Sequence, residues 1–170
     1  MKQLIQDVIN WGKEKGIHDK LSANSQRVLA IGELCNEFPD AIAKGKPSAE
    51  VKKELGDVLV FYINYLVMRK PTNTSATRLR EINISTIIFK DAENACLEVY
   101  GEYTSYYDII IRGLRASHSG YYCAEFVEAI AALAKRIDSS LEECLRLAHE
   151  KNLGREHEMR DGKLVKREDL

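Results

Sequence analysis

Two pairs of acidic residues stand at helical spacing in the sequence. Glu33 and Glu37 are four residues apart in the segment IGELCNEFPDAI, and Glu54 and Asp57 are three apart in KKELGDV. On a helix, either spacing places both side chains of a pair on one face. Two unit charges about 4 Å apart repel by roughly 4 kcal/mol at an effective dielectric constant near 20. Such pairs therefore need protons, basic side chains or a cation to neutralise them.

Converging carboxylates offer the oxygen ligands that Mg²⁺ prefers in proteins, and a bound Mg²⁺ commonly contacts substrate phosphates as well. A site of this kind would activate water for attack at phosphorus and neutralise the charge that develops there. The alternative is a solvated helix face, on which Lys52 and Lys53 act as partners of Glu54. The spacing by itself leaves both alternatives open.

Two consecutive helices are expected to position the acidic pairs. The second helix of the chain should end at Gly45 with a bend at Pro39, and the third should span residues 49–70, ending before Pro71. The short connection KGKPSAE favours antiparallel packing, which would bring four carboxylates together. The second helix shows an apolar stripe at Val28, Ile31, Cys35, Phe38 and Ile42.

The other segments also favour helices. Apolar spacing predicts a first helix that weakens at Gly12 and ends by Gly16, and further helices over 121–137 and 139–152, the last opened by a capping box of Ser140 and Glu143. The final residues, 153–170, read as a structured tail. The expected fold is therefore an all-α helical bundle, with residues 1–170 forming a single domain.

The composition is that of an ordinary globular protein. The chain has 170 residues, 45% of them hydrophobic, and a net charge of -1 with both signs interspersed, which argues against nucleic-acid and membrane partners. No signal peptide or membrane span is visible, so a cytoplasmic location, in a bacterial cell or a phage-infected host, is expected. The cysteines lack metal-ligand spacing and are predicted to be reduced thiols in the core: Cys35, Cys96, Cys123 and Cys144.

Several segments follow one another in an order that resembles a known family. They are INWGKEKGI in the first helix, the acidic second helix running into DAIAKGK, KKELGDVLV in the third, and SLEECLRLAHEKNLGRE with DGKLVK near the end. This order resembles the MazG-like family of all-α nucleoside triphosphate pyrophosphohydrolases, particularly its small single-domain members from phages and bacteria. The resemblance covers roughly residues 1–68 and 126–168.

The resemblance implies an Mg²⁺ site, with Mn²⁺ as an alternative, built from acidic residues of two helices. It implies hydrolysis of an NTP or dNTP to the monophosphate and pyrophosphate, and a homodimer or homotetramer. The catalytic and metal-binding residues would be Glu33, Glu37, Glu54 and Asp57. The substrate-binding residues would be Asn152, Arg155 and Lys166 at the phosphates, Trp11, His18 and Gln26 nearer the base or sugar, and also Lys53.

The first acidic pair departs from the family pattern, in which adjacent glutamates are followed by another glutamate three residues after the second. Counting from Gln26, Glu33 takes the second position and Asn36 the third. Counting back from DAI, Glu37 takes the third position and Leu34 the second. Either a one-residue bulge near Asn36 lets both glutamates face the metal, or one ligand has been lost. We favour the bulge, because such bulges are frequent at functional sites in helices.

Residues 70–125 match no motif of the family and are expected to be an insertion. Their tyrosines are expected to belong to an added helix pair, with base stacking or a subunit interface as the alternative roles. Three functions remain open at this point. They are the pyrophosphohydrolase, a catalytically decayed relative that binds or sequesters nucleotides, and a helical module whose tyrosine-rich segment binds a protein partner.

Overall fold

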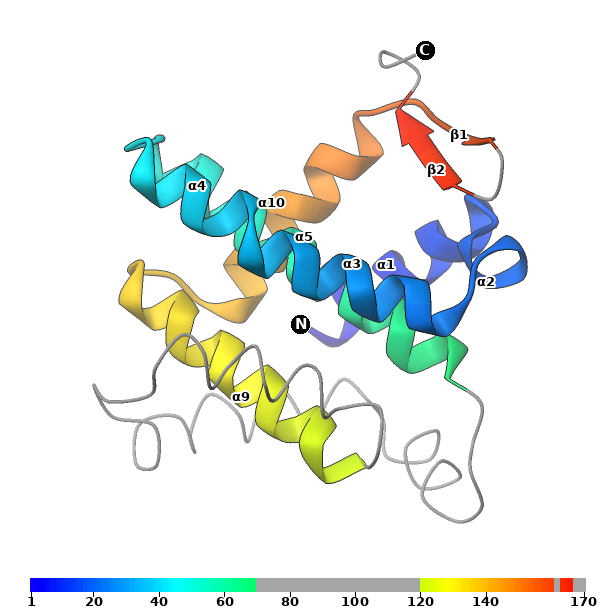
Figure 1. Ribbon diagram of the computed structural model, residues 1–170, viewed down its shortest axis with the longest axis horizontal. Coiled ribbons are helices and arrows are strands. Elements are labelled where there is room, and N and C mark those ends of the chain that lie inside the picture. Colours follow the sequence, from blue (N-terminus) through cyan, green and yellow to red (C-terminus); the bar gives the residue numbers. More distant parts are fainter. Residues whose placement is uncertain (70–119, 161–162, 167–170) are drawn as a thin grey trace. The chain divides into compact units, whose positions relative to one another are not determined.

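The computed structural model describes residues 1–69, 120–160 and 163–166 (Figure 1). Over these residues the protein is predominantly helical, with one two-stranded sheet, which confirms the expected all-α class. The chain divides into two compact units, one formed by residues 3–69 and 142–170 and the other by residues 1–2 and 70–141. Most of the expected insertion, residues 70–119, lies outside the described residues. Helix α9, Gly120–Arg136, follows it.

The first unit opens with three helices: α1 (Lys2–Glu14), α2 (Ile17–Lys20) and α3 (Ala23–Cys35). Gly16 separates the first two and has a φ of 74°, a left-handed conformation that glycine adopts without a steric penalty. Ser22 caps α3, since its hydroxyl oxygen accepts a hydrogen bond from the backbone N–H of Ser25 at 3.1 Å. Gly16 and Ser22 determine where α3 begins, and therefore where Glu33 lies along it.

A break at Asn36 separates α3 from α4 (Glu37–Ala43). Pro39 explains it, because proline has no N–H to offer the carbonyl of Cys35 four residues earlier, and its ring crowds that carbonyl. The backbone of Asn36 still donates to Gly32 at 2.9 Å and accepts from Asp40 at 3.0 Å. Where a one-residue bulge was expected, the structure therefore has a break between two helices at Asn36.

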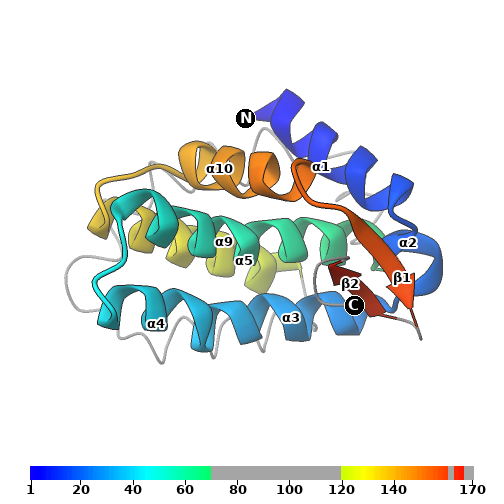
Figure 2. The same ribbon diagram turned by 90° about the horizontal axis from the view of Figure 1, so that it is seen from above.

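Helix α5 (Ser48–Met68) lies between α3–α4 and α10 (Leu141–Leu153), as Figure 2 shows. The packing against α10 is very close at Gly56, where an added Cβ would lie 2.1 Å from the carbonyl oxygen of Cys144 and 2.7 Å from Cβ of Ala148. A glycine at this position lets the two backbones approach one another. The acidic residues of α5 are thereby brought within reach of α10.

The buried face of α3 and α4 differs from the expected stripe. The buried residues recur mainly at intervals of four and include two alanines: Gln26, Ala30, Leu34, Phe38 and Ala41. Val28 and Ile42 are 56% and 50% exposed, and Cys35 is exposed as well, so the prediction that these three residues are buried was wrong. Ala30 and Ala41 are the small residues through which α3 and α4 pack against α5, and a pattern of large apolar residues does not include them. Cys144 is buried as predicted.

After α10 the chain forms a hairpin of β1 (His157–Arg160) and β2 (Lys163–Lys166), paired antiparallel with His157 opposite Lys166. The expected structured tail therefore contains a small sheet. None of the helices in the described ranges is both long enough and apolar enough to cross a membrane.

Candidate metal centre

Three carboxylates from two helices meet in the first unit. One oxygen atom from each of Glu33, Glu54 and Asp57 lies within 4.8 Å of the others. Glu33 comes from α3, and the other two come from one face of α5, against which α3 packs. Glu54 and Asp57 are each only 8% exposed. The structure therefore contains a largely buried acidic cluster that could hold a metal ion.

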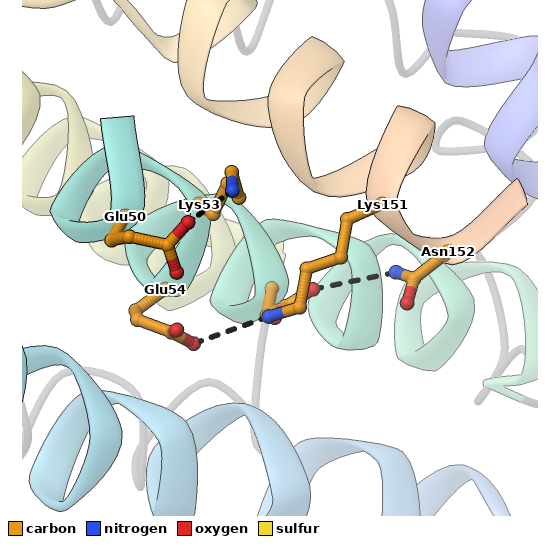
Figure 3. Close-up of polar contacts among 6 residues, drawn as sticks. Glu50, Lys53, Glu54, Lys151 and Asn152 are labelled. Carbon is orange, nitrogen blue, oxygen red and sulfur yellow. Dashed lines mark hydrogen bonds and ion pairs between the residues drawn. The ribbon is translucent and has the colours of Figure 1, made fainter. Parts of the chain in front are cut away.

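Helix α10 contributes two polar side chains to the cluster (Figure 3). Nζ of Lys151 lies 2.6 Å from Oδ2 of Asp57 and 3.4 Å from Oε2 of Glu54. Nδ2 of Asn152 donates to Oδ1 of Asp57 at 3.3 Å. The buried face of α10 runs through Leu141, Cys144, Leu145 and Ala148, and the next positions of the same face are Lys151 and Asn152. Both oxygens of Asp57 are thus contacted from α10.

Glu33 has neither a hydrogen bond nor an ion pair within the described part of the chain. Burial, together with the negative charges of Asp57, Glu54 and Glu37, raises its pKa from 4.5 to about 7, and Lys151 offsets only part of this rise. At neutral pH the carboxyl of Glu33 is therefore divided between its protonated and ionised forms. A cation would stabilise the ionised form.

Asp57 and Lys151 form a pair that is largely withdrawn from water. Burial raises the pKa of Asp57 above its ordinary value, although the charge of Lys151 and its hydrogen bond act in the opposite direction. Burial alone would lower the pKa of Lys151, but the charges of Asp57 and Glu54 outweigh that effect and hold it above its ordinary value. Lys151 therefore stays protonated and serves as a positive charge inside the cluster.

Glu37 is not among the carboxylates that meet within 4.8 Å. It is exposed at the start of α4, although its charge still acts on Glu33. Asn36 is also exposed, and its Nδ2 donates to the carbonyl of Gly32 at 3.0 Å, while Leu34 is fully buried in the core. The ligand role of Glu37 stays a prediction, and neither of the alternative residues faces the cluster.

The donor set suits a divalent cation that prefers oxygen. All three acidic side chains offer carboxylate oxygens, and no thiol or imidazole belongs to the cluster as described. A single ammonium does not balance the three carboxylates when all of them are ionised. Mg²⁺, Mn²⁺ and Ca²⁺ prefer such ligands. The residues therefore fit the expected Mg²⁺ or Mn²⁺ without selecting between them.

A second polar arrangement joins α2 to α5. Nε2 of His18 lies 2.7 Å from Oδ1 of Asn64, whose Nδ2 donates to the carbonyl of Val60 at 2.9 Å. Since the amide nitrogen is already a donor, Oδ1 accepts and Nε2 carries the proton. A Cβ on Gly12 would lie 2.1 Å from Oδ1 of Asn64, so the pair requires glycine there. Asn64 follows Asp57 by two helical turns on the same face, about 10 Å along the axis.

Trp11 and Gln26, which were expected near the base or sugar, are both buried. The indole of Trp11 meets the ring of His157 edge-on, with centroids 5.7 Å apart and an interplanar angle of 83°. Neither Nε1 of Trp11 nor Oε1 of Gln26 has a hydrogen-bond partner within the described ranges. Their role in substrate binding stays a prediction, as does that of His18.

Three basic residues were expected to bind the substrate, two of them, Arg155 and Lys166, at the phosphates. Lys53 forms an ion pair with Glu50 on its own helix. Arg155 follows α10, and its charge acts on Lys151, which places it within electrostatic range of the cluster. Lys166 lies in β2, and its side chain falls outside the described residues.

Two polar residues of this region, Lys151 and Asn64, were not among the site residues predicted from the sequence. Both carried a signal. Lys151 continues the apolar stripe of α10 at a spacing of three from Ala148, and Asn64 is a single polar residue in the apolar run VLVFYINYLVM. A polar side chain at a buried position of a helix requires a partner, which is the physical basis on which both could have been selected.

The site therefore consists of Glu33, Glu54 and Asp57, which Lys151 and Asn152 contact from α10. Comparisons with family models, curated proteins and solved structures found no match to this chain.

Proposed function

We propose that the protein is a divalent-metal-dependent nucleotide pyrophosphohydrolase, which converts an NTP or dNTP to the monophosphate and pyrophosphate. The observation that carries the proposal is the meeting of Glu33, Glu54 and Asp57 within 4.8 Å on two packed helices. The resemblance of the sequence to the MazG-like family supplies the substrate class and the bond that is cleaved. That family membership is part of the proposal.

Glu33, Glu54 and Asp57 would hold the metal ion. When bound, Mg²⁺ or Mn²⁺ would neutralise phosphate charge and lower the pKa of a bound water. The carboxyl of Glu33 has a pKa of about 7 and would release its proton if a cation bound, so metal binding should be coupled to proton release near neutral pH.

The end of α10 would bind the phosphates. Lys151 and Asn152 already reach the acidic cluster, and Arg155 lies within electrostatic range of Lys151. Charge-assisted hydrogen bonds from such side chains to phosphate oxygens are short and strong, and they would orient a triphosphate against the metal. The pair of His18 and Asn64 lies two turns along α5, where the rest of a nucleotide would extend.

Product analysis tests this proposal. The full chain would be incubated with each NTP and dNTP and Mg²⁺ or Mn²⁺, and the products separated by ion-exchange chromatography. We expect the monophosphate and pyrophosphate. We also expect Glu54→Gln and Asp57→Asn to lower kcat at least about hundredfold, while Glu14→Gln, at an exposed site on α1, leaves it unchanged. Activity that persists in both cluster variants, or release of the diphosphate and orthophosphate, would exclude the proposed site or reaction.

The second candidate function is nucleotide sequestration without turnover. The position of Glu37 favours it, because this residue lies apart from the three carboxylates that meet and a ligand would then be missing. Calorimetry decides between the two functions. Tight nucleotide binding with no product at any divalent metal would select sequestration.

The remaining expectations concern partners. The tyrosine-rich segment of the proposed interaction module falls largely within residues 70–119, outside the described residues. The homodimer or homotetramer stays a prediction, which sedimentation of the purified chain would test.

A further inference from the structure

The side chain of Lys151 occupies the acidic cluster. Its Nζ lies 2.6 Å from Oδ2 of Asp57 and 3.4 Å from Oε2 of Glu54. The Lys151 side chain is 16% exposed and each of the two carboxylate side chains is 11% exposed, so water screens these charges little. The ammonium therefore contacts two of the three side chains that a metal ion would use.

One ammonium does not balance three carboxylates. When Glu33, Glu54 and Asp57 are all ionised, an excess of two negative charges remains beside Lys151. A divalent cation at the same side chains attracts them twice as strongly as a single positive charge at equal distance, and it repels the ammonium. Lys151 and the metal ion should therefore compete for Glu54 and Asp57.

An incoming polyphosphate would offer Lys151 another partner. Asn152 is its neighbour on α10, and Arg155 is close enough for its charge to act on Lys151. A phosphate group bound by these side chains would present oxygens that accept charge-assisted hydrogen bonds from an ammonium. The lysine released by the metal would then remain neutralised.

We propose that Lys151 is the resident cation of the acidic cluster in the free protein, where it lowers the affinity for divalent metal, and that it moves to a phosphate oxygen when metal and polyphosphate bind together. This inference rests on the proposed metal site. Because binding couplings are reciprocal, metal and polyphosphate would each raise the affinity for the other. The free protein would accordingly bind divalent metal weakly.

Calorimetric titration of the full, nucleotide-free chain tests the inference, first with Mg²⁺ or Mn²⁺ and then with tripolyphosphate at saturating metal. Lys151→Met should raise metal affinity about ten- to hundredfold, the range expected when one charged hydrogen bond no longer has to be broken. The same variant should lower tripolyphosphate affinity about tenfold. Lys151→Arg keeps the positive charge, so its affinities for metal and tripolyphosphate should be close to those of the wild type. A merely structural role would not move the two affinities in opposite directions.

Lys52→Met is the matched control. Nζ of Lys52 lies 3.0 Å from Oε1 of Glu143, so this pair also joins α5 to α10, and its lysine side chain is 15% exposed. It contacts no member of the cluster in the described structure and should leave both affinities unchanged. If the wild type binds metal and Lys151→Met binds it with equal or lower affinity, this inference alone is overturned. The same holds if Lys52→Met changes the two affinities as much as Lys151→Met does. A wild type that binds no divalent cation overturns the proposed function as well.

A measurement on the wild type covers the case in which Lys151→Met fails to fold. The ammonium of Lys151 should give a protected ¹H–¹⁵N signal in the metal-free protein, assigned by its absence in Lys151→Arg. Saturating Mg²⁺ should shift or broaden that signal and leave that of Lys52 in place. A signal of Lys151 that stays unchanged while Mg²⁺ binds would overturn the inference.

Discussion

Nζ of Lys151 and Oδ2 of Asp57 lie 2.6 Å apart on two packed helices, and both side chains are largely buried. Removing the ammonium leaves the Asp57 carboxylate beside two other carboxylates in a site that water hardly reaches, whereas removing the Asp57 charge still leaves Lys151 with Glu54 at 3.4 Å. We therefore expect Lys151→Met to lower the free energy of unfolding by about 3 kcal/mol in metal-free buffer, and Asp57→Asn to lower it by less. Urea denaturation with EDTA present measures this change.

A double-mutant cycle separates the pair from other effects of the two substitutions. The double variant should lose less unfolding free energy than the two single variants lose together, and the difference, which is the coupling energy, should be about 1–3 kcal/mol. The Lys52–Glu143 pair is the control, because Glu143 is 39% exposed and its coupling should stay below about 1 kcal/mol. Additive losses at Asp57 and Lys151 would mean that their contact contributes nothing to stability.

Glu33 should make the stability of the metal-free protein depend on pH. Its pKa is about 7 in the folded protein, against 4.5 for the free side chain. Between these values the folded state keeps a proton that the unfolded chain has lost, so the contribution of Glu33 is fully present below pH 4.5 and is lost as the pH rises through 7. The side chain in Glu33→Gln does not ionise, so this variant lacks the loss of stability that the wild type shows as the pH rises. The unfolding free energy of the variant minus that of the wild type should therefore be larger at pH 8 than at pH 5.

Chemical denaturation at several pH values, with EDTA present, checks this expectation. Glu14→Gln, at an exposed site on α1, provides the reference for removing a glutamate elsewhere. A difference in unfolding free energy between Glu33→Gln and the wild type that stays constant from pH 5 to pH 8 would contradict the assigned environment of Glu33.

Two helical glycines should respond to alanine with opposite signs. At Gly56 an added Cβ meets the backbone carbonyl oxygen of Cys144 at 2.1 Å, so Gly56→Ala should force α5 and α10 apart and destabilise the fold by about 2 kcal/mol or more. At Gly32 nothing lies within 4 Å, so Gly32→Ala should gain up to about 1 kcal/mol from helix propensity. Thermal denaturation of both variants measures the contrast. A stabilising effect of Gly56→Ala would argue against the close packing of the two helices.

Glu37 provides the test of the first acidic pair. Because it is exposed and lies apart from the three carboxylates that meet, Glu37→Gln should weaken metal binding much less than Glu33→Gln does. We expect a loss of severalfold from the missing long-range charge in the first case and at least about tenfold in the second. Equal losses in calorimetric metal titrations would mean that the joint at Asn36 closes when metal binds and brings Glu37 in as a ligand.

Local signals in the sequence predicted the features that depend on local physics. The spacing of Glu54 and Asp57 placed both on one helix face, Pro39 indicated a bend in the second helix, and apolar residues at helical intervals indicated a predominantly helical protein. Each of these features is determined by interactions between residues that are close in the sequence.

Features that depend on contacts between helices were harder to predict. Lys151 reaches Asp57 only because Gly56 allows α10 to pack closely on α5, and this approach has no periodic signature in the sequence. The buried face of α3 was misassigned because Ala30 contributes to it while Val28 lies exposed, and hydrophobicity alone ranks these two residues the other way round. Whether Glu37 joins the cluster depends on the dihedral angles at Asn36, which no spacing rule fixes.

The proposed hydrolytic function and the role of Lys151 both require a divalent cation held by Glu33, Glu54 and Asp57. The most direct test is to titrate the nucleotide-free protein with Mn²⁺ and to measure the concentration of free Mn²⁺ by electron paramagnetic resonance. We predict saturable binding in the wild type that is lost in Asp57→Asn and in Glu54→Gln, is kept in Glu14→Gln and is displaced by excess Mg²⁺. Binding that persists in both cluster variants, or a wild type that binds no Mn²⁺, would contradict the account.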